Sequence, residues 1–286
     1  MGHPLLQTTK SRIEPFLRDR RVTLLGILGV LTLLLACYPA NEVTYSSPQD
    51  PGAAQWLIEF RTGEDKVHME LRYQRKREKG HGYSSNGFMI APEKLTGLTR
   101  AQAMSSGTNV KFQLQRDAGT FYFEGWFKEG NGSGHFTFSP NTSFGAELNR
   151  LGIGTPDAEQ QLSMALHDVG FALINELKSQ SYEQPTLEQL VKMGQHGVHL
   201  EYVQGLKSLG YSVKYIDFLI KMRDHGVTVN FIRELTSLNY TGLTAEELIR
   251  TRDHGVTGKF IEEFRAAGYN QQTLEDWIKL RDHGVS

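Results

Sequence analysis

A histidine followed by glycine and valine returns at a fixed spacing through the second half of the chain. The string RDHGV occupies residues 223–227, 252–256 and 281–285, and five histidines follow one another every 29 residues. These are His167, His196, His225, His254 and His283. A row of imidazoles could bind metal ions. Equivalent side chains on neighbouring helices lie about 8 to 10 Å apart, whereas two imidazoles on one zinc ion need nitrogens within about 4 Å. The spacing therefore predicts no metal site.

The same residues are typical of the end of a helix. Glycine adopts the left-handed backbone that closes a helix at its C-terminus, and a histidine just before it can meet the last unpaired carbonyl groups. We therefore interpret the motif as a structural helix end. The residues concerned are His196, Gly197, His225, Gly226, His254, Gly255, His283 and Gly284.

Tyrosines and apolar residues follow the same 29-residue period, which indicates an internal repeat. Each unit predicts two short helices, such as those over residues 229–238 and 245–253. Thr244 with Glu247 forms a capping box at the start of the second helix, as does Thr186 with Gln189. Thr228 is placed to cap the first helix, and Thr257 does the same in the next unit. One unit buries too little to fold alone, so stacked units are expected to form an α-solenoid over residues 165–286.

The repeats resemble the "HGVT" helical repeats of uncharacterised bacterial exported proteins. The resemblance rests on the forms LxxLGY and LxxLRxHGVT and covers residues 165–286. Such repeats are also appended to membrane metallopeptidases of the β-lactam-sensor type. The resemblance does not imply peptidase activity. That activity needs the motif HExxH, and the strings beginning at His68 and His199 lack it.

The first half of the chain alternates apolar and polar residues with a period of two, which predicts β-strands. Such segments lie at residues 56–61, 66–74 and 109–116, and two aromatic strands flank the glycine-rich residues 130–135, expected as a hairpin turn. Residues 54–148 therefore predict an antiparallel β-domain, a sandwich or a flattened barrel, between linkers at 38–53 and 149–164. The whole chain is predicted to be an α+β protein of several domains.

Residues 1–37 have the layout of a signal peptide or membrane anchor, with arginines before an apolar run that ends at Cys37. Leu34, Leu35, Ala36 and Cys37 resemble the lipobox of bacterial lipoproteins, in which the cysteine carries the lipid. An uncleaved anchor and ordinary secretion are the alternatives. All three predict that residues 38 onward lie outside the cytoplasm, on the periplasmic side of the membrane.

Two charged surfaces are candidates for binding. A basic run could contact anionic lipid head groups; its residues are Arg72, Arg75, Lys76, Arg77 and Lys79. Positions that vary between repeats could form a protein-binding surface; they are Lys178, Lys207, Glu234 and Glu263. The formal net charge of −1 gives no basic footprint for nucleic acid.

These features favour a membrane-tethered scaffold that binds cell-envelope proteins through its repeats. One alternative is a sensor in which the β-domain takes a ligand and the repeats relay its presence to a membrane partner. The other is a hydrolase with its site in the β-domain. No carboxylate or histidine pattern predicts a catalytic residue, and no motif predicts a cofactor.

Overall fold

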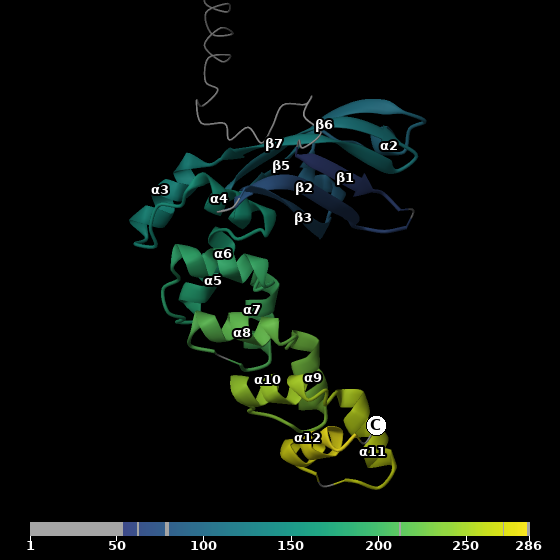
Figure 1. Ribbon diagram of the computed structural model, residues 1–286, viewed down its shortest axis with the longest axis vertical. Coiled ribbons are helices and arrows are strands. Elements are labelled where there is room, and N and C mark those ends of the chain that lie inside the picture. The colour runs from purple at the N-terminus through teal and green to yellow at the C-terminus, as the bar shows by residue number, and fades with distance from the viewer. Residues whose placement is uncertain (1–53, 62, 78–79, 212, 271, 285–286) are drawn as a thin grey trace, which may run out of the picture. The chain divides into compact units, whose positions relative to one another are not determined.

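The computed structural model describes residues 54–61, 63–77, 80–211, 213–270 and 272–284 (Figure 1). These residues all belong to one compact unit. None of its helices is long and apolar enough to cross a lipid bilayer. The predicted leader with Cys37, the linker at 38–53 and Lys79 lie outside the described residues.

Seven strands form one antiparallel sheet in the order β3-β2-β1-β7-β6-β5-β4. Their bounds are β1 Gln55–Glu59, β2 Val67–Arg77, β3 Gly80–Ile90, β4 Leu95–Thr96, β5 Thr108–Arg116, β6 Gly119–Lys128 and β7 Asn131–Pro140. The antiparallel arrangement is confirmed. The expected sandwich or flattened barrel is replaced, in the described chain, by a single sheet whose end strands are β3 and β4. Alternation of apolar residues shows only that one face of each strand is buried. A single curved sheet has that pattern as well as a pair of packed sheets, so the sequence could not distinguish them.

Trp56 shows how the sheet bends around its own core. Its ring centroid lies 5.1 Å from that of Phe112, although β7 and β6 separate the two strands. The indole reaches across because Gly134 and Gly125 lie beneath it, and a Cβ at either position would come within 2.8 Å of the ring. The indole nitrogen donates to the carbonyl of Glu124 at 3.2 Å. These glycines thus let one aromatic side chain cover two strands.

The glycine-rich residues 130–135 are mostly strand and not turn. The β6–β7 hairpin turns at Glu129 and Gly130, whose φ angles of 51° and 84° are left-handed, and β7 already begins at Asn131. The hairpin was correctly predicted, but its loop is two residues long. The remaining glycines serve core packing, since a Cβ at Gly132 would lie 2.4 Å from the ring of Phe127.

The second half of the chain is helical. After η1 Pro92–Lys94 and α2 Arg100–Ala103 within the sheet region, the helices are α3 Thr142–Arg150, α4 Ala158–Leu166, α5 Phe171–Ser179, α6 Leu187–Gln195, α7 Leu200–Ser208, α8 Ile216–Asp224, α9 Val229–Ser237, α10 Ala245–Asp253, α11 Gly258–Ala266 and α12 Leu274–Asp282. The expected linker at 149–164 contains most of α4, because Asp157 and Gln160 form a capping box that the sequence analysis overlooked. Helix α4 contacts α6, α6 contacts α8, and α5 contacts α7 (Figure 1).

The predicted helix ends are confirmed. Both capping boxes, at Thr186 and at Thr244, are formed, and Thr228 caps α9 through the amide of Phe231 at 3.0 Å. The glycines of the RDHGV motif have φ angles between 69° and 76°. Position, length and termination of each helix pair thus follow from the repeat.

Candidate functional site

The repeat histidines join neighbouring repeats. His225 Nδ1 lies 2.7 Å from a carboxylate oxygen of Asp253, and His254 Nδ1 lies 2.6 Å from that of Asp282. His196 pairs with Asp224 in the same way. We call these three bonds the His–Asp ladder. The expectation that each histidine meets the carbonyls of its own helix holds only for His283, whose Nδ1 lies 2.6 Å from the carbonyl of Lys279. The earlier histidines have the aspartate of the next repeat within reach, and a carboxylate is the stronger acceptor.

The arginine of the motif also reaches back to the preceding repeat. The guanidinium carbon of Arg223 lies 5.1 Å from the ring centroid of Tyr202. The same contact joins Arg252 to Phe231 at 5.4 Å and Arg281 to Phe260 at 4.9 Å. We call these contacts the Arg–aromatic stack. Each later pair of repeats is therefore joined by one polar and one cation–π interaction.

Both interactions are missing where the first two repeats meet. The position of the stacking arginine holds Gly194, and the position of the aromatic residue holds Leu173. Gln195 takes the place of the ladder aspartate. His167 instead approaches the sheet, where Asn86 Nδ2 lies 3.2 Å from its Nε2. The stack is thus altered at both partners, whereas the ladder keeps its histidine and has lost only its acceptor.

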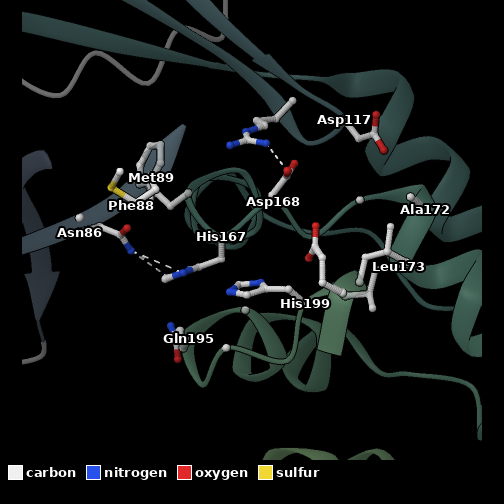
Figure 2. Close-up of a pocket in the computed structure, with 18 of the residues that line it drawn as sticks. Asn86, Phe88, Met89, Asp117, His167, Asp168, Ala172, Leu173, Gln195 and His199 are labelled. Carbon is white, nitrogen blue, oxygen red and sulfur yellow. Dashed lines mark hydrogen bonds and ion pairs between the residues drawn. The ribbon is translucent and has the colours of Figure 1, made fainter. Parts of the chain in front are cut away.

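A cavity of about 510 Å³ lies at this place, and we call it the junction pocket (Figure 2). Its walls come from β3, from the turn between β5 and β6, and from the first two repeats. The residues are Ser85, Asn86, Gly87, Phe88, Met89, Arg116, Asp117, Leu166, His167, Asp168, Gly170, Ala172, Leu173, Gly194, Gln195, Gly197, His199, Leu200 and Glu201. The altered repeat positions therefore face one cavity.

The β5–β6 turn fastens the sheet to the first repeat on one side of the pocket. The carboxylate of Asp117 accepts from the backbone amide of Phe171 at 2.8 Å and caps α5 from outside. This approach requires Gly170, since a Cβ there would lie 2.4 Å from that carboxylate. Arg116 pairs with Asp168, a residue with a φ of 54° where the later repeats have glycine. Left-handed backbone is uncommon for a residue with a side chain, and it is often held at functional positions.

Two histidines face the pocket in uncharged form. Burial lowers the pKa of His167 to about 4, and the neighbouring His199 adds to the effect. Burial also lowers the pKa of His199. A neutral ring accepts at one nitrogen, which suits the amide donor of Asn86. Figure 2 shows both imidazoles beside Gln195 at the pocket wall.

His199 occupies a position that the later repeats use for a helix cap. Helix α7 has no side-chain cap at His199, whereas the threonine at the same position caps α9 and α11. A missing cap costs about 1 kcal/mol. At this position the second repeat thus has an imidazole that lines the pocket, where the next two repeats have a capping threonine.

The pocket is suited to binding. Its polar groups are two imidazoles, two amides, three carboxylates, one guanidinium and the hydroxyl of Ser85, and Phe88 and Leu173 are among its apolar lining residues. The exposed lining is more polar than apolar, so hydrogen bonds and charge would contribute much of the binding. Among the described residues, no three histidine, cysteine, aspartate or glutamate side chains come together as metal ligands would.

The site residues expected from sequence lie elsewhere. Lys178, Lys207, Glu234 and Glu263 are all exposed on the repeats, and Lys207 pairs with Glu176 at 3.2 Å.

The basic run is only partly described. Arg72 is exposed but pairs with Glu70 at 2.9 Å. The backbones of Arg75, Lys76 and Arg77 belong to β2.

Sequence reasoning missed the junction pocket, although a signal was present. Gly194 and Gln195 stand where the last three repeats have arginine and aspartate, and His199 stands where the next two have threonine. Nothing in the sequence showed that Asn86 or Asp117 would face them. Comparison of the chain with protein-family models, curated proteins and solved structures gives no match.

Proposed function

We propose that this protein is a binding protein whose ligand occupies the junction pocket. The observation that carries the proposal is the convergence of the altered repeat positions on one cavity. Gly194 and Leu173 remove the stack, Gln195 removes the ladder acceptor, and His199 replaces a cap. Loss of three stabilising features at one place is explained by a ligand that needs the space and the polar groups.

A ligand at this site would contact the sheet and the repeats together. Sheet and repeats are joined at the pocket by Asn86 with His167, by Arg116 with Asp168, and by Asp117 with the start of α5. Occupancy would therefore stabilise one arrangement of the two parts. This supports the sensing alternative, in which an α-solenoid carries the state of the pocket to a partner in the membrane. The leader expected from the sequence is the reason to propose this arrangement on the outer side of the membrane.

The test compares the wild-type chain with a double variant, Gln195→Asp with His199→Thr, that restores the ladder acceptor and the helix cap. Both proteins are extracted from native membranes in mild detergent, and their bound molecules are weighed by native mass spectrometry. We expect an added mass on the wild type that the variant lacks at equal folded content. The same added mass on both proteins, or none on either, would reject the pocket as the ligand site.

A protein-binding scaffold is the second candidate. It is favoured by the exposure of Lys178, Lys207, Glu234 and Glu263 on helices whose buried side is filled by apolar residues. Stacked helical repeats provide broad surfaces for partners. Charge reversal at Lys178 and Lys207 should abolish capture of a cell-envelope protein by in vivo crosslinking while the pocket ligand remains bound. Capture that survives the reversal would exclude this surface.

A further inference from the structure

Strand β3 forms one edge of the sheet and is unusually open. It is 11 residues long and pairs with β2 on one side; in the described chain no strand pairs with the other side. The opposite edge strand, β4, has only two residues. Short edge strands are a common protection against pairing with other chains, and long exposed ones invite it.

Residues 82–90 also lack the side chains that usually protect an edge. They carry no charged residue and no proline, and both types are common protection at exposed edges. Tyr83 and Met89 are 70% and 51% exposed although both are large and apolar. A long edge strand without charged residues or proline is suited to accept a further strand.

The junction pocket opens along this edge. Five consecutive residues of β3, from Ser85 to Met89, line the pocket. Successive side chains of a strand point to opposite faces, so a pocket over one face would meet every second residue. Contact with five in a row indicates that the pocket reaches the edge itself, where unpaired backbone groups lie. Figure 2 shows Asn86, Phe88 and Met89 together on one side of the pocket, with Asn86 joined to His167.

We infer that the ligand of the junction pocket is an extended peptide segment that adds to the sheet as a strand beside β3. The inference rests on the proposed function and names its ligand class. Backbone hydrogen bonds to β3 would supply affinity, and the side chains facing His167, His199 and Gln195 would supply selectivity. Asp117, Asp168 and Glu201 outnumber Arg116 on the walls, so the segment should carry lysine or arginine in preference to acidic residues.

The probe is a phage-displayed library of linear 12-residue peptides, selected on the full-length chain in detergent micelles. Enriched sequences are then synthesised, and their dissociation constants are measured by fluorescence anisotropy. A second series carries N-methyl groups at alternate peptide positions. N-methylation removes backbone donors and leaves every side chain, so it tests strand pairing without any change to the protein.

Protein variants give the matching test. Met89→Lys places a charge on the β3 edge at an exposed position, and Leu57→Lys places the same charge on the same exposed face of β1, inside the sheet. Unfolding temperatures establish that both variants fold. We expect the synthetic peptides to bind at least tenfold more weakly to Met89→Lys and to bind Leu57→Lys as they bind the wild type. N-methylation in one alternating register should weaken binding by at least tenfold.

Three results would overturn the inference. Enriched peptides that bind all variants equally, or that tolerate both N-methylated registers, would exclude strand addition at β3. A failed selection beside a small-molecule mass in the native extract would leave the pocket as a binding site but reject a peptide ligand. A dimer of the chain that Met89→Lys dissociates would assign the edge to a second copy.

Discussion

The neutral state of His167 makes stability depend on pH in a defined direction. Burial lowers the pKa of this imidazole from 6.5 to about 4 in the folded chain. The unfolded chain therefore binds the proton first as pH falls. The contribution of the neutral His167 side chain to the free energy of unfolding is fully present above pH 6.5. It is lost progressively as pH falls toward about 4.

The size of this loss in unfolding free energy follows from how far the pKa of His167 is lowered. Between pH 7.5 and pH 4.5 the linkage relation gives an upper limit of about 2.5 kcal/mol. His167 lines an open pocket and is only partly shielded from water, so solvent screening reduces the expected loss to about 1 to 2 kcal/mol.

The assay is urea unfolding of the full-length chain in detergent at four pH values between 7.5 and 4.5. The perturbation is His167→Gln, which keeps an acceptor for Asn86 and does not titrate. The difference in unfolding free energy between wild type and variant should fall by about 1 to 2 kcal/mol as pH falls. His135→Gln, at an exposed histidine of β7, is the control. A wild type that gains stability relative to His167→Gln at low pH would refute the reasoning, because the charged ring would then be favoured by a nearby carboxylate.

Three further predictions concern stability. His199→Thr should restore the helix cap and raise the unfolding free energy by up to about 1 kcal/mol, measured by urea titration; a clear loss would show that the imidazole is needed for folding. Gly134→Ala should cost at least about 2 kcal/mol, because the new methyl group would lie 2.1 Å from a carbonyl oxygen under the indole. Gly145→Ala, whose nearest contact is 3.6 Å away, should be neutral or stabilising by thermal unfolding. A double-mutant cycle on His225→Ala and Asp253→Ala should give a coupling of about 0.5 to 1 kcal/mol with unchanged metal content; zero coupling would exclude the ladder as a stabilising contact.

The helical half could be predicted closely because its signals are local. A capping threonine, a glycine with left-handed backbone and a 29-residue apolar period each fix one part of a helix pair. The contacts between repeats were less predictable. His225 and Asp253 are 28 residues apart, and their pairing depends on how the helix pairs are placed in space.

The sheet was predicted less completely because one strand carries no apolar alternation. Residues 83–87 read YSSNG, which favours a turn, yet they belong to β3 because pairing with β2 supplies the backbone bonds. This missed strand forms a wall of the junction pocket. The altered repeat positions were a signal in the sequence, but the wall from the sheet could not be predicted, since the pocket brings Asn86, Asp117 and His167 together across more than 80 residues.

One experiment tests most directly whether the junction pocket is where the protein binds. A photo-crosslinking amino acid is placed at Ala172, which lines the pocket, or at Lys178, which is exposed on the same helix α5. Both proteins are irradiated in intact cells, and adducts are identified by mass spectrometry. We predict an adduct at position 172 that disappears when Gln195→Asp and His199→Thr are added. Adducts at position 178 alone, with none at 172, would contradict the account and move binding to the outer surface of the repeats.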